Sequence, residues 1–153
     1  MLKPDQKLAI HFFEQIDKLN GQMGHGVLRY SRNPIACAID LNHGGRSTRD
    51  LLDFGPDVPI YSNVESAMSA GGEVLILGMA PSGGRLPSEM VEEVDRAVSA
   101  GMSVINGLHE QLGPRYPNLP EGQWIWDIRQ EPKDLGIAWA RAAKLSNRRA
   151  LLV

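Results

Sequence analysis

The chain has 153 residues, of which 42% are hydrophobic and 22% charged, and its formal net charge is −2. These proportions are those of one folded domain and exclude a disordered tail. Because Lys and Arg are scattered, the charge pattern argues against a general nucleic-acid interface and against a helix for anionic membranes. The single cysteine, Cys37, excludes an internal disulfide and a cysteine zinc cluster.

The N-terminal segment MLKPDQKLAI has no long apolar region of the kind that signal peptides carry. No apolar run approaches the roughly 20 residues that are needed to span a bilayer. We therefore expect a cytoplasmic protein with neither a membrane nor a nucleic acid as partner. We also expect it to form a homo-oligomer.

Short apolar segments recur along the chain and are separated by turn residues. The sequence predicts strands at 7–13, 34–41, 58–61, 73–79, 102–108, 123–128 and 149–153. Between them it predicts helices at 49–54, 62–69, 88–100 and 133–145. A glycine-rich stretch at 21–26 follows the first strand. Several strands are nearly continuous in apolar residues, as strands buried on both faces are. The predicted fold class is therefore α/β, a Rossmann-like three-layer sandwich with a mostly parallel sheet.

Ligands of an open parallel sheet bind beyond the carboxyl ends of its strands, so the loops at those ends are the candidate sites. One such loop is HGGRST, residues 43–48. The amides of Gly44 and Gly45 can approach a ligand closely, and the Arg46 guanidinium suits phosphate or carboxylate. Ser47 and Thr48 add hydroxyls at a helix N-terminus. The alternative is a glycine turn with a solvated arginine and a helix cap.

The loop APSGGRLP, residues 80–87, has the same character. Pro81 and Pro87 stiffen it, and Gly83, Gly84 and Arg85 are candidates to hold a phosphate or a substrate carboxylate. Two such loops after separate strands favour a ligand role for at least one of them.

Other polar residues also follow the predicted strands. Asp40 is a candidate acceptor for ribose hydroxyls, and His109 is a candidate acid–base residue. For Glu110 and Asp127 we favour structural roles. The remaining histidines have no metal-ligand spacing, so no metal site is predicted.

Two common nucleotide motifs are absent from the sequence. Gly21, Gly24 and Gly26 run G-x-x-G-x-G, far beyond the first strand, and do not form the G-x-G-x-x-G dinucleotide fingerprint. There is also no G-x-x-x-x-G-K-[ST] phosphate loop. An ordinary NAD-dependent oxidoreductase domain therefore ranks last, and the mid-strand Cys37 is interpreted as a core residue.

The segments GVLRY (26–30), AIDLNHGGRSTRDL (38–51), VPIYSNVESAM (58–68), LILGMAPSGGRLP (75–87), AVSAGMSVINGLHEQL (97–112) and IWDIRQEP (125–132) together resemble one bacterial and archaeal family. It is a domain-of-unknown-function family that combines an N-terminal Rossmann-like domain with a C-terminal P-loop domain. The segment at 58–68 is also similar to the CoA-binding domains of succinyl-CoA-synthetase-type ligases.

The family resemblance implies that residues 1–148 form the Rossmann-like domain and that residues 149–153 begin a strand leading to a P-loop domain absent from this chain. It implies acetyl-CoA or another phosphate-bearing nucleotide as ligand, with ATP and Mg²⁺ bound only through that second domain. Some members of the family are assigned as D-glutamate N-acetyltransferases, so the first hypothesis is the binding domain of such an enzyme, inactive alone. The alternatives are a non-catalytic CoA- or nucleotide-sensing module and an NAD-dependent epimerase- or dehydratase-like domain.

Overall fold

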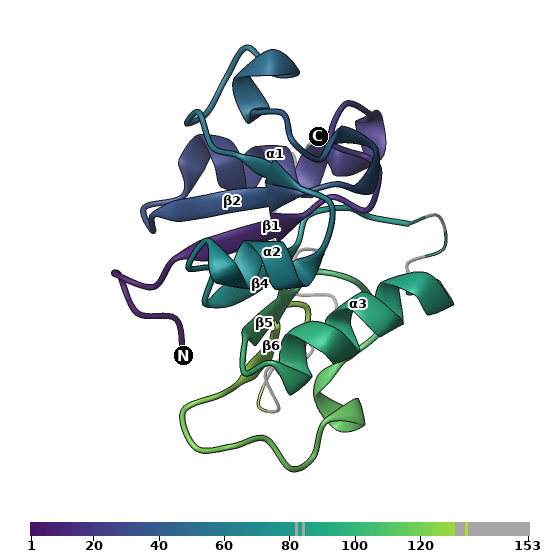
Figure 1. The fold of residues 1–153 in the computed structure, drawn as a ribbon. Helices are drawn as coiled ribbons and strands as arrows, with labels where there is room; N and C mark the ends of the chain where they lie inside the picture. The colour runs from purple at the N-terminus through teal and green to yellow at the C-terminus, as the bar shows by residue number, and fades with distance from the viewer. Residues whose placement is uncertain (82, 84, 131–133, 135–153) are drawn as a thin grey trace, which may run out of the picture.

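The computed structural model describes residues 1–81, 83, 85–130 and 134. Six strands of this part form one sheet in the order β3-β2-β1-β4-β5-β6, and every neighbouring pair is parallel (Figure 1). The strands are β1 (Leu8–His11), β2 (Ile35–Ile39), β3 (Ile60–Tyr61), β4 (Val74–Leu77), β5 (Ser103–Asn106) and β6 (Ile125–Asp127). The strand order reverses between β1 and β4, and crevices for ligands form at such switch points.

Within the described residues, three α-helices cover the two faces of the sheet: α1 (Gln22–Tyr30), α2 (Val64–Ser69) and α3 (Ser88–Ser99). Figure 1 shows α2 and α3 on one face and α1 on the other. Alternate residues of β1 show why both faces are apolar: Ala9 packs in a core with α2 and α3, whereas Ile10 packs in a second core with Leu28 of α1. The predicted three-layer sandwich is confirmed.

All six predicted strands that fall in the described residues are present, with ends trimmed by one or two residues. The glycine-rich stretch, for which no element was predicted, forms α1, because tertiary packing outweighs the low helix propensity of glycine. The predicted helix at 49–54 is wrong: only a 3₁₀ turn, Thr48–Asp50, forms before Gly55 and Pro56 end the segment. The elements predicted at 133–145 and 149–153 lie outside the described residues. None of the described helices is long and apolar enough to cross a membrane.

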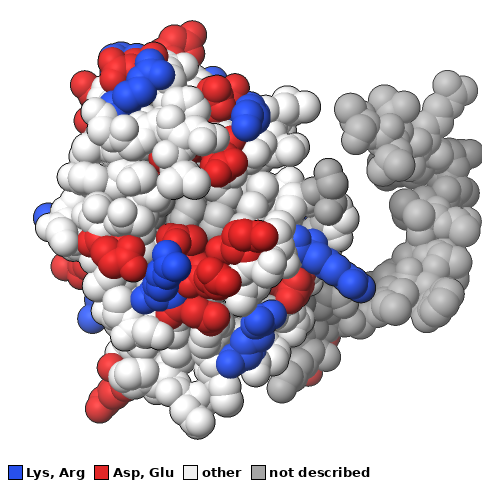
Figure 2. Space-filling model, turned by 45° about the vertical axis from the view of Figure 1, so that its right-hand side comes forward, with Lys and Arg blue, Asp and Glu red and all other residues white. Residues whose placement is uncertain are grey.

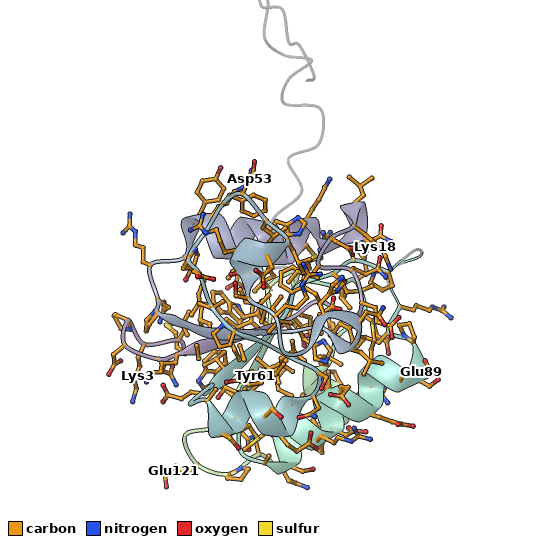
Figure 3. The ribbon with its side chains drawn as sticks, turned by 45° about the horizontal axis from the view of Figure 1, so that its top comes forward. Lys3, Lys18, Asp53, Tyr61, Glu89 and Glu121 are labelled. Atoms are coloured by element: carbon orange, nitrogen blue, oxygen red, sulfur yellow. The ribbon has the colours of Figure 1, made fainter. Side chains whose placement is uncertain are left out.

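Because all the strands are parallel, their amino ends lie along one side of the sheet, the amino edge, and their carboxyl ends lie along the other, the carboxyl edge. In Figure 3, Lys3 and Glu121, which precede β1 and β6, lie on one side of the molecule, whereas Lys18 and Glu89, which follow β1 and β4, lie on the other. The second side is the carboxyl edge, so it is the side on which the loops after the strands meet.

Candidate functional site

The N-terminus of α1, where dinucleotides commonly place their pyrophosphate, is closed by the protein itself. The amide of Gly24 donates to the carbonyl oxygen of Gly78 at 2.6 Å, and the amide of Ala80 donates to that of Asn20 at 3.1 Å. A Cβ on Gly24 would lie 2.6 Å from Cζ of Phe12 and 3.0 Å from the Gly78 oxygen. Gly24 therefore serves close packing of α1 on the strands.

An open pocket lies further along the carboxyl edge, between the loops that follow β4 and β5. Its volume is about 390 Å³, and it is lined by Ala80, Pro81, Gly83, Gly107, Leu108, His109 and Arg129. A second hollow of about 470 Å³ shares two of these residues and is lined by Gly83, Arg85, His109 and Glu110. Together they form one surface with two arginines, which we call the β4–β5 pocket.

Arg129 is held in this pocket by the backbone. Its Nε donates to the carbonyl oxygen of Gly107 at 2.6 Å, and its Nη1 lies 3.5 Å from Nε2 of His109. None of the ion pairs among the described residues involves Arg129 or Arg85. Among the described residues, no carboxylate thus pairs with either guanidinium, and their remaining N–H groups can donate to an anion.

Two carboxylates hold the loops of the β4–β5 pocket in place. Glu110 accepts a hydrogen bond from the amide of Leu86 at 3.0 Å, which ties the loop after β5 to the loop after β4. Asp127 accepts three bonds, from the side-chain amide of Asn106 and from the amides of Leu112 and Gly113, at 2.7 to 2.9 Å. Both residues have the structural roles that the sequence favoured.

The loop at 43–48 lies elsewhere, against the edge strand β3. The amide of Gly45 donates to Ile60, and the carbonyl of Arg46 accepts from the amide of Ile60. Ser47 forms a capping box with Asp50, whose backbone carbonyl also accepts from the Arg46 guanidinium at 3.2 Å. Through these contacts, the loop at 43–48 forms a turn whose backbone is hydrogen-bonded to β3.

Three further residues predicted at the site lie in that part of the edge. Gly44 packs against Ser62, and a Cβ on Gly44 would lie 2.9 Å from the Ser62 Cβ. Thr48 is 1% exposed, and its hydroxyl donates to Pro56 and accepts from Val58. Asp40 is fully buried and accepts bonds from two backbone amides and from Nδ1 of His43. We therefore leave Asp40 and Thr48 out of the proposed site.

The structure thus separates the two glycine loops that the sequence suggested. Residues 43–48 follow β2 and bond to β3, whereas Pro81, Gly83 and Arg85 follow β4 and meet His109. Gly84, the remaining predicted residue, lies outside the described residues. The sequence analysis did not single out Arg129, because its local sequence, IWDIRQEP, contains no known binding motif. Its position just beyond the predicted strand at 123–128 is the one feature that could have indicated a place at the carboxyl edge.

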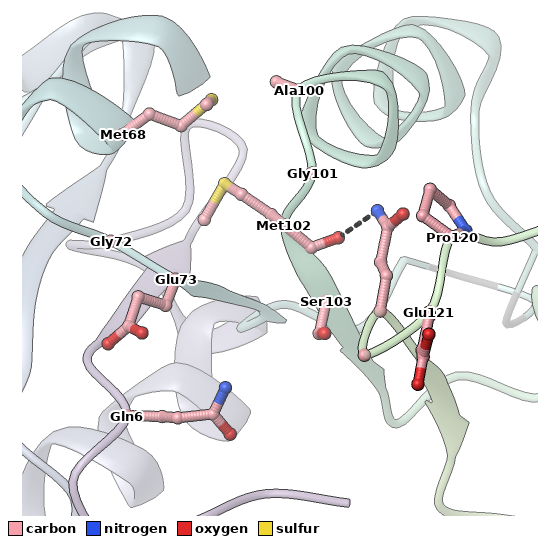
Figure 4. Close-up of a pocket in the computed structure, with 12 residues that line it drawn as sticks. Gln6, Met68, Gly72, Glu73, Ala100, Gly101, Met102, Ser103, Pro120 and Glu121 are labelled. Atoms are coloured by element: carbon pink, nitrogen blue, oxygen red, sulfur yellow. Dashed lines mark hydrogen bonds between the residues drawn. The ribbon is translucent and has the colours of Figure 1, made fainter.

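A further pocket of about 390 Å³ opens at the amino edge, among Gln6, Glu73, Ser103 and Glu121 (Figure 4). Gln123 also lines this pocket; its side-chain amide donates to the carbonyl oxygens of Val98 and Met102 at 2.7 Å and so ties α3 to the turn before β6. Because this edge is opposite the carboxyl ends of the strands, we assign it a structural role.

The surface is mixed in charge. Figure 2 shows acidic side chains gathered beside basic ones over the middle of one face. Within the described residues, no group of three or more His, Cys, Asp or Glu side chains is placed to hold a metal ion. Burial raises the pKa of the Cys37 thiol to about 12, which agrees with its interpretation as a core residue.

An all-parallel sheet in this order, covered on both faces and open at its carboxyl edge, defines a Rossmann-like α/β domain. Residues 41–131 match the family described as "Domain of unknown function (DUF1611_N) Rossmann-like domain", and the chain belongs to this family. The resemblance to the N-terminal Rossmann-like domain of this family, noted in the sequence, is thereby confirmed.

Among the solved structures that are similar to the chain is the crystal structure of a DUF1611 family protein from Anabaena variabilis ATCC 29413. It is 39% identical, with a TM-score of 0.82 over 92% of this chain. The chain spans 42% of the length of that protein. No curated protein matches the chain.

Proposed function

We propose that this domain binds a phosphate-bearing small molecule, such as acetyl-CoA or another nucleotide, in the β4–β5 pocket. The observation that carries the proposal is that His109 lines two neighbouring hollows, one of about 390 Å³ with Arg129 and one of about 470 Å³ with Arg85. Pockets of roughly 300–1,000 Å³ are typical of small-molecule sites. Their place at the carboxyl edge is where α/β sheets bind ligands.

The backbone of the pocket also suits an anion. Gly83 has a φ of 82°, a conformation that favours glycine, and a Cβ there would meet nothing within 4 Å. A ligand can therefore approach the chain at Gly83 closely. Arg129, already oriented by Gly107, would then supply a fixed pair of donors to a phosphate.

His109 is exposed, and its Nε2 lies beside Arg129, with no carboxylate among its described hydrogen-bond partners. This arrangement favours contact with the ligand over proton transfer in the domain alone. An acid–base role for His109 remains a hypothesis for the larger enzyme.

We propose further that the domain serves a two-domain, nucleotide-dependent enzyme, with a P-loop domain as its partner. An amino-acid N-acetyltransferase that uses acetyl-CoA and D-glutamate is the activity that the family resemblance suggests. The solved relative is more than twice as long as the matched part, which leaves room for a second domain in that protein.

Thermal unfolding with acetyl-CoA, ATP, NAD, NADP and inorganic phosphate tests the binding proposal. A ligand at 100 times its Kd stabilises the folded state by about 2.7 kcal/mol, and this is worth about 5–10 °C in a domain of this size. Arg85→Ala and Arg129→Ala should each remove at least half of the ligand-induced shift. Because Arg129 also bonds to Gly107, its removal can lower the Tm of the free protein. The ligand-induced shift in Tm, and not the Tm itself, is therefore compared between the variant and the wild type.

Arg46→Ala is the matched control, since Arg46 is an exposed arginine that also follows a glycine pair. It should leave the ligand-induced shift unchanged. Loss of the shift in Arg46→Ala but not in Arg85→Ala would move the site to residues 43–48. No shift with any phosphate-bearing ligand would overturn the proposal.

A further inference from the structure

A separate crevice of about 400 Å³ lies on the α3 side of the carboxyl edge, where β1 ends. The rings of His11 and Phe13 and the apolar side chain of Met90 form part of its lining. Its other lining residues include four carboxylates, Glu14, Glu89, Glu92 and Glu93. Figure 3 shows Glu89 at this edge of the molecule.

His11 is the last residue of β1 and is 5% exposed. Its Nδ1 accepts a hydrogen bond from the amide of Phe13 at 3.1 Å, and its ring stacks on the Phe13 ring with centroids 3.6 Å apart. Burial lowers the pKa of His11, so the ring is neutral near pH 7. Because Nδ1 is the acceptor, the proton of the neutral ring is on Nε2, which makes Nε2 a donor.

The His11 donor faces the Glu93 carboxylate at a distance longer than that of an ordinary hydrogen bond. Nε2 of His11 and Oε2 of Glu93 are 3.5 Å apart, and both atoms are buried without a hydrogen-bond partner among the described residues. The other Glu93 oxygen is bonded to Nη1 of Arg96 at 2.6 Å, which fixes the direction of the carboxylate. A buried donor and a buried acceptor therefore lie side by side, and a ligand group reaches both atoms when these two side chains move apart.

We propose that this crevice binds an uncharged, hydroxyl-bearing ligand of the sugar or polyol class. One hydroxyl would accept a hydrogen bond from Nε2 of His11 and donate one to Oε2 of Glu93. Only a group that both accepts and donates satisfies both atoms, and a hydroxyl does so. Phe13 and Met90 offer apolar contact to the C–H face of such a ligand.

The alternatives fit the same atoms less well. A phosphate or carboxylate would accept from His11 but would meet the charge of Glu93 and of the three other glutamates. An ammonium group would suit the carboxylates but would leave the Nε2 proton of His11 unpaired. The charge of the crevice thus opposes that of the β4–β5 pocket.

The loop after β4 separates the two sites. Ala80, Pro81 and Gly83 line the β4–β5 pocket, whereas Pro87, at the other end of the same loop, lines the crevice. One loop therefore contacts both ligands. The inference about the crevice stands independently of the phosphate proposal, because the two sites share none of their lining residues.

Saturation-transfer-difference NMR with D-ribose, D-glucose, D-glucuronate and D-glucose 6-phosphate tests this inference. The wild-type chain should give signals for the two neutral sugars and much weaker ones for the two anionic sugars. His11→Phe removes the donor and Glu93→Met removes the acceptor. Each should weaken sugar binding by about tenfold, the effect of losing one hydrogen bond to a charged or buried partner.

Glu92→Met is the matched control, because Glu92 lines the crevice but is not among the polar partners of His11 in the described residues. It should keep the neutral-sugar signals. A ¹⁵N–¹H spectrum shows which variants fold, and either His11→Phe or Glu93→Met is sufficient for the comparison. The proposal is overturned if no neutral sugar gives a signal, if the anionic sugars bind better, or if folded His11→Phe and Glu93→Met bind like the wild type.

Discussion

Replacing Gly24 with alanine should destabilise the domain, whereas the same change two residues along α1 should stabilise it. A Cβ at position 24 would be 2.6 Å from Cζ of the fully buried Phe12 and 3.0 Å from the Gly78 oxygen, whereas a Cβ at Gly26 would meet nothing within 4 Å. Overpacking costs about 1–3 kcal/mol, and alanine returns about 1 kcal/mol of helix propensity. Because an aromatic ring and a carbonyl oxygen are both too close, we take the upper end of that cost.

The expected free energy of unfolding therefore falls by about 2 kcal/mol in Gly24→Ala and rises by about 0.5–1 kcal/mol in Gly26→Ala. Urea unfolding followed by circular dichroism measures both. Both substitutions add one methyl group to one helix, so Gly26→Ala controls for propensity. If Gly24→Ala is as stable as Gly26→Ala, the account of Gly24 as a packing residue, and of the α1 N-terminus as closed, is refuted.

Three further changes test the assigned structural roles. Thr48→Val should cost about 2 kcal/mol because two backbone partners of its buried hydroxyl lose their bonds, and Thr48→Ser should cost much less in the same urea titration. Burial lowers the pKa of His11 from 6.5, although Glu93 and Asp40 oppose the shift, so the unfolded chain binds a proton that the folded chain does not. The free energy of unfolding should thus decrease as pH falls below about 6.5, and His11→Gln should reduce that slope; equal slopes would contradict the neutral state of His11. Asp127→Ala removes three hydrogen bonds and should lower stability by about 2–3 kcal/mol, with faster hydrogen exchange in 107–113; unchanged exchange there would argue against its role.

The sheet was predictable because its strands carry their own signal. Apolar runs such as EVLILGM and PIACAIDL are typical of strands buried on both faces, and β4 and β2 form within them. Helix α1 was not predictable in the same way. Its stability comes from the fit of Gly24 against Phe12 and Gly78, which are distant in sequence, so local propensity gave no indication of it.

The sites were predictable only in part. The carboxyl-edge rule directed attention to the loops at 43–48 and 80–87, but it did not show which loop would bond to its own neighbours. In the first loop, the amide of Gly45 bonds to β3. The approach of His11 to Glu93, 82 positions apart in the sequence, and that of Arg129 to Gly107 depend on tertiary folding, and no motif marks them.

The same residue types therefore have different roles at the two loops. The glycine pair at 44–45 makes a turn against Ser62 and Ile60, and Arg46 bonds within its own segment. At the second loop, Arg85 lines an open pocket with His109. This difference in hydrogen bonding is why the proposal of a phosphate site rests on one loop and not on both.

Hydrogen–deuterium exchange with and without saturating acetyl-CoA tests the central claim most directly, because it locates the ligand on the chain. The β4–β5 pocket predicts slower exchange in peptides covering 78–87 and 107–112, with no change in peptides covering 43–48. Slower exchange at 43–48 alone, or no protection at 78–87 and 107–112, would contradict the account.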